Sequence, residues 1–267
     1  MAGGMILSEE IQAPAAGQRP RLYLMDELRG FAVFCMVFYH AFYTFAFLYQ
    51  IKWMMILFQF FTPAEPFFAA LFIMISGISS LLSRSNLRRG LRLLAIALAV
   101  TLVTAIVTPD YAIWFGILHF LAVCMILYGL LSRYLKKIPF SWAIVLLLVL
   151  LYFFTRPIPS GYLGFGPVSV IPLPGEIYHI PGLFPLGFYD SSFRSSDYFP
   201  LLPWGFLFLA GTMIGIPVAK GLAPQWMYPS RIPFFSWMGR WALIIYMAHQ
   251  PLIYALAWLL ERLGLIG

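Results

Sequence analysis

The sequence predicts an all-α membrane protein that crosses the bilayer about seven times. Hydrophobic residues make up 62% of the 267 positions and charged residues only 10%, whereas charged residues reach roughly 25% in a soluble domain. Apolar runs of about 20 residues, the length that spans a bilayer as a helix, recur along the chain. We expect one transmembrane domain over residues 26–267 after a cytoplasmic segment over residues 1–25, which lacks the pattern of a signal peptide.

The first three spans are expected at residues 28–49, 66–83 and 91–108. Asp26 and Glu27 precede the first span, and acidic residues suit a helix start as a cap and as partners of the helix dipole. Residues 50–65 include the apolar run WMMILFQFF, which fits either a short helix at the outer interface or a core-packing segment. An arginine-rich turn separates the second and third spans, and Gly77 before it permits close helix packing.

The other four spans are expected at residues 113–132, 139–155, 199–218 and 240–261. The connection over residues 156–198 is the longest, and its seven prolines and six glycines exclude a regular helix. Its many aromatic residues argue against disorder. We therefore expect a long ordered outer loop that caps the outer side of the bundle.

The basic residues predict the orientation of the chain. Thirteen of the 17 Lys and Arg residues fall on one side of the predicted spans, and the other four are Lys52, Arg156, Arg194 and Arg262. By the positive-inside rule the N-terminus is cytoplasmic and the C-terminus faces out, in a multi-pass protein expected in the cell membrane. The net charge of +7 does not indicate nucleic-acid binding, because the basic residues do not interleave with exposed aromatic residues.

Arg29 and His40 are the strongest candidates for function on the first span. They are eleven positions apart, which places them on one helix face and about 16 Å apart along the axis. With Arg29 at the cytoplasmic rim, His40 lies near the middle of a hydrocarbon core about 30 Å thick. An ionisable residue there indicates a functional site. The structural alternatives are a snorkelling anchor for Arg29 and a packing role for His40.

His119 and His249 reach a similar depth on other spans, so His40, His119 and His249 are the candidate catalytic residues. The sequence leaves open whether the three converge on one cavity. Their spacing does not match a zinc motif, and we expect no metal. Cys35 and Cys124 both fall inside spans and do not suggest a disulfide framework.

Two further groups of polar residues are candidates for binding. The turn after the second span could bind phosphate, because it combines arginines with serine and asparagine, which a topology signal alone does not explain. With Arg29, this group comprises Ser83, Arg84, Asn86, Arg88 and Arg89. The second group lies on the outer side and would suit sugar hydroxyls; it comprises Glu65, Asp190, Asp197 and Tyr198. The alternative for Asp197 is a cap at the start of the 199–218 helix.

Five fragments of the chain resemble, in family order, the heparan-alpha-glucosaminide N-acetyltransferase catalytic-domain family of transmembrane acyltransferases. They are DELRGFAVFCMVFYH, FIMISGISSLLSRSNLRRGLRLL, VTPDYAIWFGILHFLAVCMILYGLL, SSDYFPLLPWGFLFLAGTMIG and LIIYMAHQPLIYAL. The resemblance implies transfer of an acetyl group from cytoplasmic acetyl-CoA to a hydroxyl or amine of an acceptor on the far side of the membrane. The spacing of Arg29 and His40 is also similar to the arginine-histidine signature of membrane acyltransferases that modify cell-surface polysaccharides.

The resemblance also implies roles for the candidate residues. The arginine turn would hold CoA, and His40 would act either as a general base or as a residue that is itself acetylated. His119 or His249 would orient His40 or polarise the thioester carbonyl. The chain is shorter than the family's best-known eukaryotic member, so the expected acceptor is another glycan, glycolipid or amino sugar. The expected partners are the lipid bilayer, acetyl-CoA and this acceptor, and a homodimer is compatible with the sequence.

Two other classes of function remain as alternatives. A proton-coupled small-solute transporter would use the histidines as an intramembrane relay. Transporters of this kind often contain internal repeats, and the sequence shows none. A non-catalytic membrane scaffold would leave the mid-depth histidines and the arginine turn unexplained.

Overall fold

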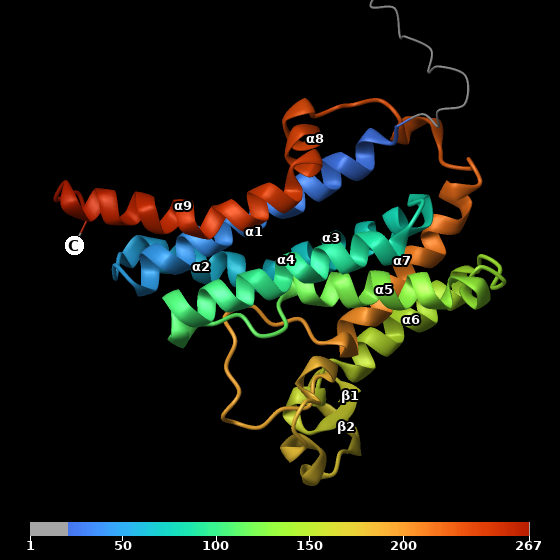
Figure 1. Ribbon diagram of the computed structural model, residues 1–267, viewed down its shortest axis with the longest axis horizontal. Helices are drawn as coiled ribbons and strands as arrows, with labels where there is room; N and C mark the ends of the chain where they lie inside the picture. Colours follow the sequence, from blue (N-terminus) through green and yellow to red (C-terminus); the bar gives the residue numbers. More distant parts are fainter. Residues whose placement is uncertain (1–20, 267) are drawn as a thin grey trace, which may run out of the picture.

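Residues 21–266 are described by the computed structural model, and they form a helical bundle with one small hairpin (Figure 1). The helices in this part of the chain are α1 (Tyr23–Phe47), α2 (Lys52–Phe61), α3 (Glu65–Leu82), α4 (Asn86–Val107), α5 (Ile117–Leu135), α6 (Trp142–Thr155), α7 (Leu201–Ala219), α8 (Pro233–Arg240) and α9 (Ala242–Arg262). The strands are β1 (Tyr162–Phe165) and β2 (Val168–Pro172). The segment predicted over residues 1–25 falls mostly outside the described residues.

Seven helical segments of the described chain are long and apolar enough to cross a membrane, which confirms the predicted fold class. They are Tyr23–Phe47, Lys52–Leu82, Asn86–Val107, Ile117–Leu135, Trp142–Ser160, Leu201–Ala219 and Ala242–Arg262. In Figure 1, α1 begins at one end of the bundle and α9 finishes at the opposite end. The side of the membrane on which each end lies stays a prediction.

The second crossing combines α2 and α3, which are separated only by the short turn Thr62–Ala64. No residue of α2 is buried, and Trp53, Ile56 and Phe60 are among its most exposed side chains. In a bilayer these exposed side chains would lie against lipid. The other face packs on α1, with the Phe58 ring 5.2 Å from that of Tyr39, so the core-packing interpretation of residues 50–65 applies to that face only.

The acidic residues at the start of α1 do not cap that helix. The helix begins at Tyr23, earlier than predicted, and its N-cap, Leu22, makes no side-chain capping bond. Asp26 instead accepts hydrogen bonds from Arg21 Nε over 2.7 Å and Arg29 Nη1 over 3.3 Å. Its charge still lies in the first turn, where it complements the helix dipole.

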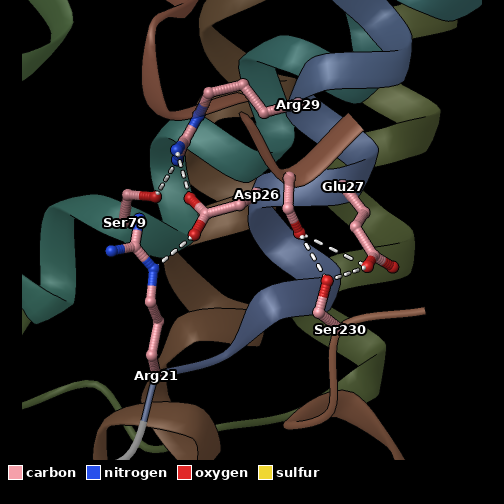
Figure 2. Close-up of polar contacts among 7 residues, drawn as sticks. Arg21, Asp26, Glu27, Arg29, Ser79 and Ser230 are labelled. Atoms are coloured by element: carbon pink, nitrogen blue, oxygen red, sulfur yellow. Dashed lines mark hydrogen bonds and ion pairs between the residues drawn. The ribbon is translucent and has the colours of Figure 1, made fainter. Parts of the chain in front are cut away.

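Glu27 connects α1 to the segment before α8, a helix that was not predicted from the sequence. Its Oε1 accepts from the backbone nitrogens of Arg231 at 2.6 Å and Ile232 at 2.8 Å. The hydroxyls of Ser230 and Ser236 also donate to it, as Figure 2 shows for Ser230. A carboxylate that accepts several bonds at a helix start satisfies donors that have no partner within the helix.

We expect Glu27→Ala to destabilise the protein by about 2–4 kcal/mol, because two backbone N–H groups lose their bonds to a buried, charged acceptor and each such bond is worth about 1.5–3 kcal/mol. Glu27→Gln keeps an acceptor oxygen but loses the charge, so its loss should be smaller. Thermal unfolding of the detergent-solubilised protein measures both effects. Equal midpoints for the wild type and Glu27→Ala would show that this contact does not hold α8 in place.

Close approach of α1 and α8 depends on glycine at the contact. A Cβ atom on Gly30 would overlap the carbonyl oxygen of Phe235, and one on Gly239 would overlap the carbonyl oxygen of Asp26. Small residues let membrane helices pack closely where hydrophobic burial supplies no driving force. Two other pairs of glycines show the same reciprocal arrangement: Gly77 with Gly211 between α3 and α7, and Gly90 with Gly129 between α4 and α5.

The long loop that follows α6 is ordered, as predicted, but it contains an unpredicted hairpin. β1 and β2 pair antiparallel with an irregularity between Leu163 and Gly164. Figure 1 shows this hairpin beside α6, at the edge of the bundle. The end of the loop returns to the helices: Ser196 N donates to Ala112 O at 3.3 Å and Phe199 N to Phe115 O at 3.0 Å. This pairing brings the loop against the start of α5.

Candidate active site

A cavity of about 290 Å³, here called the central cavity, lies among α1, α3, α5, α9 and the end of the long loop. Its polar lining residues are Tyr39, His40, Glu65, Ser196 and Tyr246. Most of the remaining wall is apolar, formed by residues such as Val33 and Phe72. A mainly apolar pocket with a few convergent polar groups is typical of a small-molecule site.

Two of the three predicted catalytic histidines meet beside this cavity. The ring centroids of His40 and His249 are 5.0 Å apart. Nδ1 of His40 lies 2.9 Å from the amide nitrogen of Gln250, and Nδ1 of His249 contacts the carbonyl oxygen of Tyr246. His249 is only 7% exposed, and its Nε2 has no hydrogen-bond partner within residues 21–266.

His119 is placed differently from this pair. Its Nε2 lies 3.1 Å from the hydroxyl of Thr101 on α4, and its ring stacks on Phe115. These contacts join α4 to α5, so a structural role accounts for the histidine at position 119. Over residues 21–266, no group of three or more His, Cys, Asp or Glu side chains is arranged to hold a metal ion.

Asp197 caps a helix, but not the one given as its structural alternative. Its Oδ2 accepts from the backbone nitrogen of Ile117 at 3.0 Å, in the first turn of α5, and from the hydroxyl of Tyr246. α7 has no side-chain cap, so the alternative that Asp197 caps the 199–218 helix is wrong. Desolvation raises the pKa of the Asp197 carboxyl, while the bonds from Tyr246 and Ile117 oppose that rise. The cap fixes Tyr246 in the wall of the central cavity.

A second cavity of about 550 Å³ lies where α1 begins and is here called the arginine-end cavity. Its charged lining residues are Arg21, Asp26, Arg29, Arg89 and Lys220. Figure 2 shows that Arg29 reaches from α1 to α3, where Nη2 donates to Ser79 Oγ over 2.7 Å. Four basic side chains against one acidic side chain make this cavity suited to an anion.

The two cavities lie along the same seam between α1 and α3. On α1, Arg29 lines the arginine-end cavity, while Met36 and His40 line the central cavity. On α3, Ser79 and Glu65 line the arginine-end and central cavities respectively. The one-face geometry predicted for Arg29 and His40 therefore corresponds to a continuous face with a cavity at each end.

The predicted phosphate-binding residues divide into two groups. Arg29 and Arg89 line the arginine-end cavity, whereas Ser83, Arg84, Asn86 and Arg88 do not. Asn86 is buried, and its Nδ2 donates to the carbonyl oxygen of Ser80, which closes the end of α3. Its role in the structure is therefore a helix-terminating contact.

The predicted acceptor-binding residues are spread over the loop end of the bundle. Glu65 lines the central cavity, and Asp190 lines a separate outer cavity of about 970 Å³. Hydrogen bonds from Ser192 lower the pKa of Asp190 and keep it anionic. The hydroxyl of Tyr198 donates to the carbonyl oxygen of Phe184, so this residue supports the loop.

Several polar residues at the two inner sites were not selected from the sequence. They include Tyr246 and Gln250 beside His40, and Arg21 and Lys220 in the arginine-end cavity. A signal for Gln250 was available, because a polar residue next to an intramembrane histidine requires a hydrogen-bond partner. Lys220 could not be selected, because the sequence alone does not show that the end of α7 lies near the start of α1.

Comparison with known proteins gives one match. The family model described as "Heparan-alpha-glucosaminide N-acetyltransferase, catalytic" matches residues 21–251. No curated protein and no solved structure matches the chain. The matched range includes α1 and the His249–Gln250 pair, and thus both cavities of the α1/α3 seam.

Proposed function

Because the chain belongs to the heparan-alpha-glucosaminide N-acetyltransferase catalytic-domain family, we propose that it transfers an acetyl group from acetyl-CoA to an extracytoplasmic acceptor. The observation that carries this proposal is the α1/α3 seam, which has a cationic cavity at one end and His40 at the other. The seam gives the donor and the acceptor separate approaches to one histidine. By the positive-inside rule, the arginine end faces the cytoplasm.

The arginine-end cavity fits the anionic part of acetyl-CoA. The donor supplies the acetyl group as a thioester and carries several phosphates. Guanidinium groups bind phosphate through two parallel hydrogen bonds, and Arg21, Arg29 and Arg89 line this cavity together with Lys220. Ser79, already bonded to Arg29, fixes the direction of that guanidinium. These residues hold the donor at the end of the seam away from the outer loop.

His40 moves the proton in this proposal. In the direct route, it takes the proton from the acceptor amine or hydroxyl, whose nitrogen or oxygen bonds to the acyl carbon while the carbon–sulfur bond breaks. The proton then passes from His40 to the sulfur of CoA. In the covalent route, the His40 nitrogen bonds to the acyl carbon while the carbon–sulfur bond breaks and the CoA thiolate leaves. The acceptor nitrogen or oxygen then bonds to the acyl carbon while the bond to His40 breaks, and the acceptor's proton ends on the CoA sulfur. Both routes need an unprotonated ring nitrogen that faces the central cavity.

The acceptor enters from the loop side. The outer cavity combines aromatic residues such as Trp114 and Tyr189 with Asp190 and Arg194, and this mixture suits the apolar faces and hydroxyl groups of a sugar. We propose a glycan, a glycolipid or an amino sugar as the acceptor class.

Proteoliposomes provide the test of this function. Labelled acetyl-CoA is supplied on the arginine-end side and glucosamine, as a probe amino sugar, on the loop side. The proposal predicts an acetylated sugar and release of free CoA thiol, both dependent on His40. Solute uptake that depends on His40, with neither CoA binding nor thiol release, would instead support a transporter.

Arg89 and Arg88 form a matched pair for the donor site, because only Arg89 lines the arginine-end cavity. We expect Arg89→Ala to weaken acetyl-CoA binding about tenfold, since one charge-assisted bond to phosphate is worth about 1.5 kcal/mol or more. Arg88→Ala removes the same charge outside the cavity and should leave affinity nearly unchanged. Calorimetric titration with acetyl-CoA measures both, and equal losses would favour a general charge effect.

A further inference from the structure

The two ring nitrogens of His40 have different surroundings. Nδ1 lies 2.9 Å from the amide nitrogen of Gln250, and an amide NH₂ group can only donate. Nδ1 is therefore the acceptor and carries no proton. A neutral His40 then carries its proton on Nε2, the one ring nitrogen that Gln250 leaves free for a ligand in the central cavity that His40 lines.

The adjacent histidine has its proton fixed in the opposite way. Nδ1 of His249 contacts the carbonyl oxygen of Tyr246, and a carbonyl can only accept. Nδ1 of His249 is therefore protonated, and its buried Nε2 is a free lone pair. Residues 246–250 of α9 thus set the proton positions on both rings.

We propose that Gln250 is a positioning residue that selects the tautomer of His40. With the amide nitrogen toward the ring, His40 presents an N–H donor to the central cavity. After a half-turn of the amide, Oε1 accepts from a protonated Nδ1, and Nε2 becomes a free base. Oε1 of Gln250 is buried without a partner within residues 21–266, so the half-turn exchanges the amide N–H bond to Nδ1 for a bond to Oε1 and breaks no other bond of Oε1.

This inference rests on the proposed function for its catalytic meaning. Proton removal from the acceptor requires the form with Nδ1–H bonded to Oε1, because Nε2 must hold a free lone pair. Once Nε2 has taken the proton, both ring nitrogens are protonated and Oε1 still accepts from Nδ1. When Nε2 delivers the proton to the CoA sulfur, the cycle is balanced. An amide suits this position because it contains both a donor and an acceptor.

The tautomer can be read directly from the nitrogen shifts of ¹⁵N-histidine-labelled protein. The His40 signals are identified by their loss in His40→Gln. In the wild type we expect His40 to carry its proton on Nε2. In Gln250→Glu we expect it on Nδ1, because a carboxylate only accepts. In Gln250→Met we expect both forms of His40. Gln225→Glu, a matched change at an exposed loop position, should leave the wild-type pattern intact.

Turnover supplies the second readout. Gln250→Met should lower kcat for acetyl transfer from acetyl-CoA to glucosamine about 100-fold, because methionine offers no strong acceptor to Nδ1–H when Nε2 has taken the proton and the ring is charged. KM for acetyl-CoA should stay within about twofold, because the donor site is not altered. Gln250→Glu should recover at least about tenfold of the loss, since a carboxylate accepts from Nδ1–H in both the neutral and the charged ring.

The inference is overturned if the wild type and Gln250→Glu show the same His40 tautomer, or if the wild type already carries its proton on Nδ1. The nitrogen shifts do not depend on turnover. An inactive wild type with the expected tautomers would therefore contradict the acetyltransferase proposal and leave the role of Gln250 standing.

Discussion

Replacement of His40 by Ala is expected to lower acetyl transfer by at least about 10²-fold, and up to 10⁴-fold, because it removes the proton-transfer group. The effect should fall on kcat. Acetyl-CoA affinity should remain near wild type, since the cationic residues that hold the donor line a separate cavity. Thiol release and calorimetric titration on the same preparation measure the two quantities.

The same variant distinguishes the two chemical routes. In the covalent route, wild-type protein incubated with acetyl-CoA without acceptor accumulates an acetylated peptide that contains His40, and His40→Gln does not. In the direct route neither protein is labelled at this position. Full turnover by His40→Ala would contradict both routes. It would make His249 the candidate reactive histidine, because its Nε2 has a free lone pair beside the same cavity.

Gly211→Ala is expected to destabilise the protein strongly. Its new Cβ would overlap the carbonyl oxygen of Met74 in α3, and a backbone atom cannot rotate away as a side chain can. Overpacking of a core costs about 1–3 kcal/mol, and a clash with backbone lies at the upper end of that range. A loss of about 3 kcal/mol would lower the unfolding midpoint by roughly 6–12 °C.

The control for this prediction lies on the same helix. A Cβ on Gly205 meets no atom within 4 Å, so Gly205→Ala should be neutral or stabilising by up to about 1 kcal/mol through helix propensity. Thermal unfolding in detergent compares the two α7 variants. Equal destabilisation would mean that glycine is needed for backbone flexibility and not for the approach of α3.

The helical fold was predictable because the bilayer imposes a simple pattern. Each crossing must be apolar over about 20 residues, and charged residues are confined to its ends. α8 escaped prediction because it is only eight residues long, contains both a proline and a glycine, and acquires its place through contacts with α1. The β1–β2 hairpin escaped because prolines and glycines exclude a helix without specifying what replaces it.

The candidate site was predictable only in part. Depth along a helix could be counted, which led to the selection of His40, His249 and Arg29, and the structure places these residues in or beside the two cavities. The sequence did not show which face of each helix points toward which neighbouring helix. For that reason His119 was grouped with the other histidines, although its ring contacts Thr101. Asn86 was chosen for its chemistry, yet its amide ends a helix.

The reciprocal glycine contacts have a consequence for biosynthesis. The α4/α5 pair is adjacent in the chain and can close while synthesis continues, whereas α1 and α3 each pack against a partner from the last third of the chain. Until α7 and α8 leave the ribosome, the glycine faces of α1 and α3 are without their partners. The arginine-end cavity includes Tyr228 and the central cavity includes Tyr246, so both cavities are completed only when nearly all of the chain has been made.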